Sequence, residues 1–362
     1  MEKLTLRKQE QGTLDFRQPS DWRSVLCWSL LPVLALVAGL GLVAGKGIAA
    51  AAYPTDNSFT AEAAFAKERA HYPDISIARV APGPGIVVER GRVYRQIGAR
   101  SLHLDLFRPD VTGEASFNVG QHPGRPAVLL VHGGGWRSGN RTLQEPMAIY
   151  LANRGFVAAT VEYRLSLEAQ YPAAVQDIKA ALCWLHRNAG QLGVDRHRIA
   201  ILGASAGAQL ATLVGVTPGI PAYREEGEGR DTACEAVAAI VNLDGVVSFI
   251  TPMALAHEND PRKNPSAAGA WFGGRYEEVP ERWREASPLE YAGAGSPPTL
   301  FINSSRPRFH AGRDEYIARL TAADVATEVM THGDSPHPFW LFQPWFDPTA
   351  ERVADFLQRV VK

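Results

Sequence analysis

Six short apolar runs recur along the chain, and none shows the polar–apolar alternation of a half-exposed strand. Strands buried on both faces give such continuous runs, and segments with helical spacing separate them here. The runs occupy residues 127–131, 157–163, 199–203, 238–244, 298–303 and 326–332. We therefore predict an α/β fold with a mostly parallel sheet that is covered by helices on both faces.

Other segments complete this prediction. Residues 85–98 and 102–109 do alternate, which indicates two antiparallel strands leading into the sheet. Helices are expected over 172–190, between Pro172 and Gly190, and near the end of the chain over 349–361. Residues 248–296, rich in Pro, Gly and Trp, interrupt the alternation. We expect this segment to form a small cap over the ends of the strands.

The first 52 residues have the order of an export signal. Basic residues precede an uncharged stretch over 25–44, and small residues follow over 49–52. An uncleaved anchor in the inner membrane is the alternative, because 20 residues lie at the lower end of what spans a bilayer. We expect an exported protein, periplasmic or secreted, with a signal over 1–52, a lead-in segment over 53–100 and a catalytic domain over 101–362.

Charge and cysteine usage exclude several classes. The 37 Lys and Arg residues nearly balance the 38 Asp and Glu residues, without the basic run expected of a nucleic-acid-binding protein. No Cys or His spacing predicts a metal site. Cys27 lies inside the apolar stretch. For Cys183 and Cys234 we expect two buried thiols, with a disulfide as the alternative in an oxidising compartment.

Ser205 carries the first sign of catalysis. It lies between Gly203 and Gly207, after an apolar run and before a helical segment. Such a strand-to-helix turn exposes the serine hydroxyl and directs free N–H groups, that of Ala206 included, at whatever the hydroxyl attacks.

The stretch HGGGW, residues 132–136, follows an earlier apolar run. Attack of a serine on an ester places negative charge on the former carbonyl oxygen, and glycine backbones can approach such an oxygen closely. We expect the N–H groups of Gly133, Gly134 and Ala206 to form the oxyanion hole.

With these motifs the chain resembles α/β-hydrolase carboxylesterases, specifically the hormone-sensitive-lipase-like branch and its bacterial feruloyl-esterase-like relatives. The resemblance extends from about Leu102 to the C-terminus and includes HGGGW, GASAG and PHPFW. It implies ester hydrolysis by a triad of Ser, His and an acid, without a cofactor.

The resemblance places the catalytic base at His337, in the loop after the last strand; His332 and His310 are the rivals. The acid is open, because the family usually has it just beyond residues 298–303, where this chain has SSRP. We favour Asp244, at the tip of the preceding strand, over Asp314 and Asp334.

Substrate features are less defined. The aromatic segments 271–274 and 339–346 are candidates for lining a sugar-binding pocket, or for the core. Arg306, Arg308 and His310 are candidates for binding a carboxylate, or for a solvated surface. We expect a carboxylesterase acting on a small-molecule or polysaccharide ester, such as an acetyl, methyl or feruloyl ester. The alternatives are a peptidase or amidase, which usually needs a further large domain, and a non-catalytic binding protein.

Overall fold

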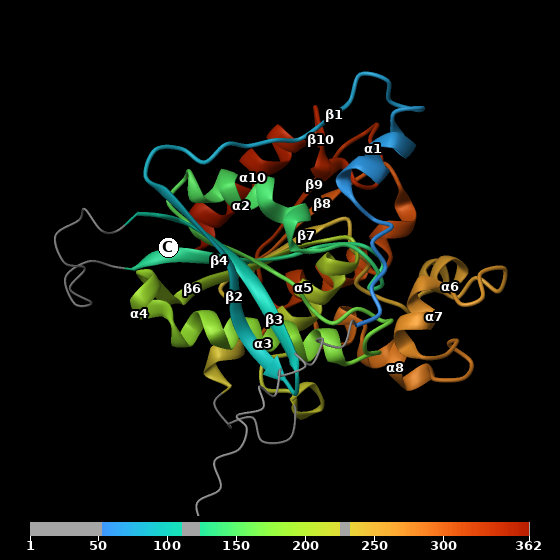
Figure 1. The fold of residues 1–362 in the computed structure, drawn as a ribbon. Coiled ribbons are helices and arrows are strands. Elements are labelled where there is room, and N and C mark those ends of the chain that lie inside the picture. Colours follow the sequence, from blue (N-terminus) through green and yellow to red (C-terminus); the bar gives the residue numbers. More distant parts are fainter. Residues whose placement is uncertain (1–52, 111–123, 225–231, 362) are drawn as a thin grey trace, which may run out of the picture. The chain divides into compact units, whose positions relative to one another are not determined.

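The computed structural model describes residues 53–110, 124–224 and 232–361, so the predicted export signal lies outside the described residues. Its centre is an eight-stranded sheet with the order β2-β3-β5-β4-β6-β7-β8-β9 (Figure 1). The strands are β2 Ile86–Ile97, β3 Arg100–Pro109, β4 Arg125–Val131, β5 Val157–Val161, β6 Val194–Ala204, β7 Ile240–Leu243, β8 Thr299–Asn303 and β9 Thr327–Thr331.

Strand directions agree with the sequence prediction. β2 and β3 are antiparallel to their neighbours, and β5, β4, β6, β7, β8 and β9 form a parallel array. The predicted α/β fold with a mostly parallel sheet is confirmed. One detail is wrong: β9 is partly exposed along its length rather than buried on both faces, because it is the edge strand.

Helices cover both faces of the sheet (Figure 1). On one face α3, α5 and α9 bury their apolar sides, and on the other α2 and α10 do so, which gives two hydrophobic cores separated by the sheet. The helices are α1 Ala61–Glu68, α2 Glu145–Ala152, α3 Ala173–Arg187, α4 Ala189–Leu192, α5 Ala206–Val216, α6 Pro252–Glu258, α7 Ala267–Phe272, α8 Pro280–Glu285, α9 Arg313–Ala322 and α10 Phe346–Val360. In the described part of the chain, no helix is long and apolar enough to cross a membrane.

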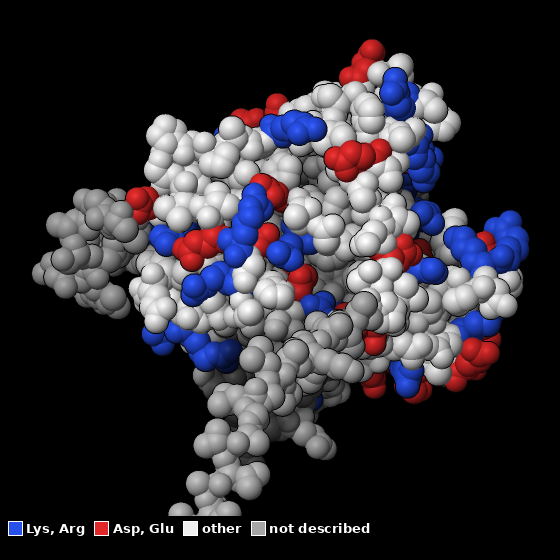
Figure 2. All heavy atoms as spheres, in the orientation of Figure 1, with Lys and Arg blue, Asp and Glu red and all other residues white. Residues whose placement is uncertain are grey.

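The predicted cap segment, residues 248–296, contains three short α-helices, α6, α7 and α8, and the 3-10 helix η4 (Pro288–Tyr291). Figure 1 shows the three α-helices grouped together beside the sheet. The N-terminal lead-in segment contains α1 and the two-residue strand β1 (Ser76–Ile77), which pairs with β10 (Phe342–Gln343). Acidic and basic side chains are interspersed on the face shown in Figure 2, as their near-equal numbers suggest.

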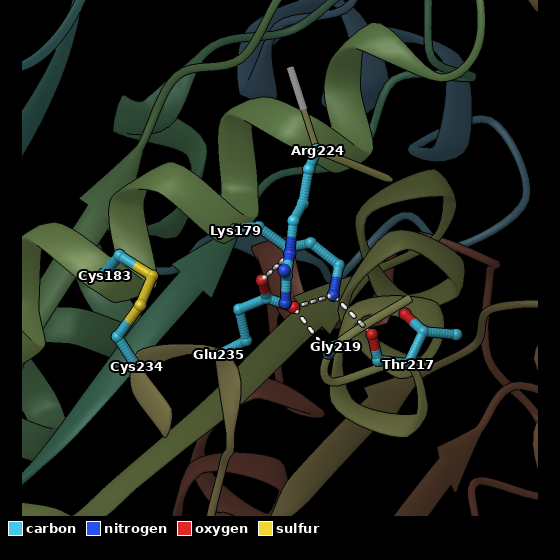
Figure 3. Close-up of a disulfide and its surroundings, with 7 residues drawn as sticks. All are labelled: Lys179, Cys183, Thr217, Gly219, Arg224, Cys234 and Glu235. Atoms are coloured by element: carbon cyan, nitrogen blue, oxygen red, sulfur yellow. Dashed lines mark hydrogen bonds and ion pairs between the residues drawn. A yellow bond between two sulfur atoms is a disulfide. The ribbon is translucent and has the colours of Figure 1, made fainter. Parts of the chain in front are cut away.

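The expectation of two free thiols is wrong, because Cys183 and Cys234 form a disulfide (Figure 3). Cys183 lies on α3, and Cys234 lies on the short 3-10 helix η3 (Ala233–Glu235) that packs against α3. Beside the disulfide, the buried Lys179 ammonium donates to the Glu235 carboxylate at 2.7 Å. The disulfide and this ion pair both join η3 to α3.

Candidate active site

Ser205 occupies a sharp turn between β6 and α5, as its sequence context predicts. Its backbone has φ 54°, in the left-handed region that non-glycine residues rarely adopt. A Cβ at Gly203 would collide with the carbonyl group of Gly207, and a Cβ at Gly207 would collide with the carbonyl oxygen of His132. The flanking glycines therefore allow the backbone to fold tightly enough to place the Ser205 hydroxyl at the end of the sheet.

The structure brings together the three side chains that the sequence favoured. His337 Nε2 lies 2.7 Å from Ser205 Oγ, and His337 Nδ1 lies 2.7 Å from Asp244 Oδ2. Asp244 directly follows β7, and His337 lies in the loop between β9 and η6 (Phe339–Leu341). The three residues thus come from the carboxyl ends of three parallel strands, which meet at one edge of the sheet.

The Asp244 carboxylate is fully buried and well supplied with donors. Ser304 donates to it from its backbone N–H at 3.0 Å and from its hydroxyl at 2.5 Å, and the Asn303 amide donates at 3.3 Å. Burial alone would raise the pKa of Asp244, but hydrogen bonds from His310 and His337 outweigh it and hold that pKa well below its usual range. The carboxylate is therefore ionised and can orient the His337 ring.

His337 is enclosed by rings. Phe309 stacks on the imidazole with ring centroids 3.3 Å apart, and Trp340 contacts it edge-on at 5.2 Å. Burial lowers the pKa of His337 below its ordinary value of 6.5, although the neighbouring Asp244 carboxylate opposes this effect. The imidazole is consequently neutral near pH 7 and can accept a proton from Ser205.

The rival candidates lie elsewhere. Asp314 is on α9, exposed and paired with Arg313, and Asp334 accepts a hydrogen bond from the Tyr72 hydroxyl. His332 is buried, with Nε2 2.9 Å from the Thr349 hydroxyl. His310 lies behind the acid, with Nε2 3.1 Å from the Ser304 carbonyl oxygen and 3.5 Å from Asp244.

The glycine-rich loop after β4 lies beside Ser205 but differs in detail from the prediction. Gly134, Gly135 and Ala206 line the cavity in front of Ser205, whereas Gly133 does not. Gly133 instead packs so closely on the carbonyl oxygen of Ala204 that a Cβ would not fit. The positive φ values of Gly134, Gly135 and Trp136 turn the chain after this contact. Gly134 and Ala206 of the expected donor set therefore face the cavity, and Gly135 faces it where Gly133 was expected.

A cavity of about 370 Å³ opens in front of these residues. Its remaining walls come from three places that the sequence did not bring together: the lead-in segment, the predicted cap segment and the loop after β8. These contribute Asp56, Ser58, Phe59, His257, Glu258, Lys263, Ser266, Ala267, Arg308 and Phe309. No residue of the aromatic segments 271–274 and 339–346 lines the cavity; Trp271, Phe272, Phe339 and Phe342 are fully buried in the two cores.

Among the described residues, no cluster of three His, Cys, Asp or Glu side chains has the arrangement needed to hold a metal ion.

Family comparison identifies the chain. The BD-FAE family model matches residues 117–309, just over half of the 362 residues, from before β4 to the stretch that stacks on His337. The chain belongs to the BD-FAE family. The matched range contains Ser205, Asp244 and the loop 132–136, and it ends before His337.

Curated relatives of this BD-FAE protein are named as esterases. Esterase LipC of Mycobacterium tuberculosis is 32% identical over 254 residues, which are 65% of this chain and 58% of LipC. Carboxylesterase NlhH of the same species is 42% identical over 101 residues, 26% of this chain and 32% of NlhH. The matches cover 58%, 60% and 50% of LipC, LipQ and LipM, so this chain spans between half and three fifths of the length of these relatives.

Solved structures share the fold. Esterase Est2 of the planctomycete Thermogutta terrifontis, with butyrate bound, superposes with a TM-score of 0.60 at 23% identity, covering 76% of this chain and 95% of Est2. A truncated carbohydrate esterase from gut microbiota superposes with a TM-score of 0.61 at 21% identity, covering 78% of this chain and 99% of its own. At these identities the likeness establishes the α/β-hydrolase fold alone.

Proposed function

We propose that this BD-FAE protein is a serine carboxylesterase with Ser205 as nucleophile, His337 as general base and acid, and Asp244 as the acid that orients His337. The observation that carries the proposal is the unbroken chain of two 2.7 Å hydrogen bonds from Asp244 through His337 to Ser205, at the wall of a cavity. A buried carboxylate, a neutral imidazole and a serine in this order are the parts of acyl transfer through a serine.

The geometry supports the following reaction. Ser205 Oγ attacks the ester carbonyl carbon while its proton passes to His337 Nε2, and the oxyanion accepts hydrogen bonds from the N–H groups of Gly134, Gly135 and Ala206. The intermediate collapses, the bond to the alcohol oxygen breaks, and His337 gives its proton to that oxygen. Water then attacks the acyl-enzyme by the same route, which releases the carboxylic acid and restores Ser205.

Small acyl groups fit the proposal best. A cavity of about 370 Å³ is near the lower end of the range for small-molecule sites. Solved structures of the fold relative Est2 contain butyrate and propionate. Acetyl esters of a polysaccharide remain within the proposal, since a structural neighbour is named a carbohydrate esterase; methyl and feruloyl esters are the other members of the expected set.

The two alternatives receive less support. The relatives named above are esterases, which favours ester over amide hydrolysis. A missing triad acid would favour a non-catalytic protein, and residues 304–307, just beyond β8, contain no carboxylate. Asp244, at 2.7 Å from His337, supplies a carboxylate from the neighbouring strand.

Turnover by the purified protein tests the proposal. We expect hydrolysis of p-nitrophenyl acetate and p-nitrophenyl butyrate, and a loss of about 10⁵- to 10⁶-fold in kcat for Ser205→Ala. Turnover of methyl ferulate and of acetylated xylan, measured in the same way, shows which of these ester classes the protein prefers. Unchanged turnover in Ser205→Ala would show that Ser205 is not the nucleophile, and failure of a fluorophosphonate probe to label Ser205 in the wild type would rule out an activated serine.

We also propose that the protein is exported. The export-signal pattern over residues 1–52 supports this, and so does the Cys183–Cys234 disulfide, because disulfides persist in oxidising compartments. Recovery of the full-length protein in a reduced form from the cytosol of its native cell would contradict export.

A further inference from the structure

The cavity contains charged groups that the proposed reaction does not use. Away from Ser205, its wall includes Glu258 at the end of α6, Lys263 after it, and Arg308 in the short 3-10 helix η5 (Pro307–His310). Two further charged residues at this wall pair with each other, since Arg137 donates to the Asp56 carboxylate at 2.9 Å.

Arg308 lies close to the catalytic base. Its guanidinium carbon sits 4.1 Å from the centroid of the Phe309 ring, and that ring stacks on His337 with centroids 3.3 Å apart. Half-buried in the wall, Arg308 makes no ion pair or hydrogen bond with any residue that the structure describes. A guanidinium held on an aromatic face keeps its donors free for a planar carboxylate.

The neighbouring charges leave Arg308 available. Among the described residues, Lys263 Nζ has one hydrogen bond, to the carbonyl oxygen of His257 at 3.4 Å. The Glu258 carboxyl forms no ion pair with described residues, and burial raises its pKa despite the opposing charges of Arg308 and Lys263. Because no described carboxylate lies within ion-pair distance of Arg308, the wall around Arg308 favours an anion from the substrate.

Chemistry decides which part of the substrate meets Arg308. His337 must give its proton to the leaving alcohol oxygen, so the alcohol portion of the ester lies on the His337 side of the cavity. Arg308 lies near His337 on that side, because both side chains contact the Phe309 ring. Resting on the proposed esterase function, we propose that Arg308 binds a carboxylate on the alcohol portion of the substrate. The substrate class is then an acylated hydroxy acid, of which an acylated uronic acid is one example.

Two pairs of esters test this assignment. The first pair, 4-acetoxybenzoate and 4-acetoxybenzamide, differs by a negative charge on the leaving alcohol. The second pair, mono-4-nitrophenyl succinate and 4-nitrophenyl butyrate, differs by a negative charge on the acyl group. We expect Arg308→Gln to reduce the ratio of kcat/KM for the charged over the neutral member of the first pair by about 10- to 100-fold, mainly through KM. The second ratio should change less than about threefold.

Matched variants control for folding and for general charge. Arg306→Gln removes an exposed arginine two residues away that does not line the cavity, and we expect both ratios to stay at the wild-type value. Glu258→Gln removes a carboxyl group of the cavity wall that interacts electrostatically with Arg308, and we expect the first ratio to rise. Labelling of Ser205 by a fluorophosphonate probe in Arg308→Gln verifies that the site is intact.

The results separate this inference from the esterase proposal. Hydrolysis of the neutral esters with a first ratio unchanged by Arg308→Gln would overturn the carboxylate assignment and leave the esterase proposal standing. A fall in the second ratio instead of the first would overturn the assignment to the alcohol portion. Failure to hydrolyse any of the four esters, without labelling of Ser205, would overturn both.

Discussion

Asp244 fixes the His337 ring by accepting a hydrogen bond from Nδ1 at 2.7 Å, which leaves Nε2 to face Ser205. An asparagine amide can donate to the ring instead, so the imidazole can adopt the tautomer that cannot accept the serine proton. We expect Asp244→Asn to reduce kcat by about 10⁴-fold, measured with p-nitrophenyl butyrate.

Asp314→Asn is the matched control for that variant. Asp314 is exposed on α9 and paired with Arg313, so its loss should leave kcat within about twofold of the wild type. A large loss of kcat in Asp314→Asn together with a small loss of kcat in Asp244→Asn would show that Asp244 is not the acid of the triad.

The buried position of His337 predicts the pH dependence of kcat/KM. The base works only when neutral, and burial lowers the pKa of His337 below 6.5. Activity should therefore be retained as pH falls to 6.5 and be lost as pH falls through the lowered pKa. Initial rates between pH 4 and 8, with circular dichroism at each pH to verify folding, measure this acid limb. A midpoint clearly above 6.5 would contradict the environment described for His337.

At the residue scale, the local turn pattern predicted Ser205 and the family resemblance predicted His337, but the acid was left among three candidates. Ser205 has neighbours in sequence that form its turn, whereas the acid depends on which strand end the His337 loop reaches. Ser304, the first residue after β8, precedes the positions where the family usually has its acid, and here it donates to Asp244. Which glycines face the cavity likewise depended on the packing of Gly133 against β6.

At the scale of elements, the disulfide joins α3 to η3 across 51 residues of chain. Closing such a loop restricts the unfolded chain, which corresponds to about 4 kcal/mol in the chain-entropy treatment, with measured values commonly 2–4 kcal/mol. We expect the Cys183→Ser, Cys234→Ser double variant to lower the free energy of unfolding by about 2–4 kcal/mol in urea titrations.

Reductant provides the control for this measurement. Dithiothreitol should lower the stability of the wild type towards that of the double variant and leave the double variant unchanged. Equal stability of wild type and double variant under oxidising conditions would show that the bond contributes nothing to folding.

The elements themselves were largely predictable. Runs buried on both faces identified the strands, because a parallel sheet between two helical layers leaves no exposed face to interrupt them. The two exceptions, the exposure of β9 and the disulfide, depend on contacts between elements, which an apolar run in the sequence does not reveal. β9 is partly exposed because no strand follows it in the sheet, and the cysteines pair because η3 packs on α3.

At the scale of the whole molecule, the sequence predicted the fold but not which distant segments form the cavity. Aromatic residues were candidates for its wall, yet Trp271 and Phe342 lie in the cores, where large apolar rings are most effectively removed from water. The lead-in segment gave no specific signal, and it contributes Asp56, Ser58 and Phe59 to the wall. Such contributions depend on long-range docking, which no local pattern records.

Ser138 is the point at which the lead-in segment docks onto the oxyanion loop. Its buried hydroxyl donates to the Asp56 carbonyl oxygen at 2.6 Å and accepts from the Phe59 N–H at 2.9 Å. Its own N–H donates to the carbonyl oxygen of Gly134, a residue of the oxyanion loop, at 2.9 Å. Through its side chain and its backbone N–H, Ser138 therefore links the N-terminal wall of the cavity to the oxyanion loop.

We expect Ser138→Ala to leave two backbone groups of the lead-in segment without partners and to lower the free energy of unfolding by about 1–3 kcal/mol. Because the same change loosens the oxyanion loop, kcat for p-nitrophenyl butyrate should fall by about tenfold at temperatures where the variant is folded. Ser101→Ala, which removes a hydroxyl whose hydrogen bond with the described residues is to Gln96 within the β2–β3 hairpin, is the matched control and should change neither quantity. A Ser138→Ala variant that loses stability at unchanged kcat would show that the lead-in segment covers the cavity without positioning the oxyanion loop.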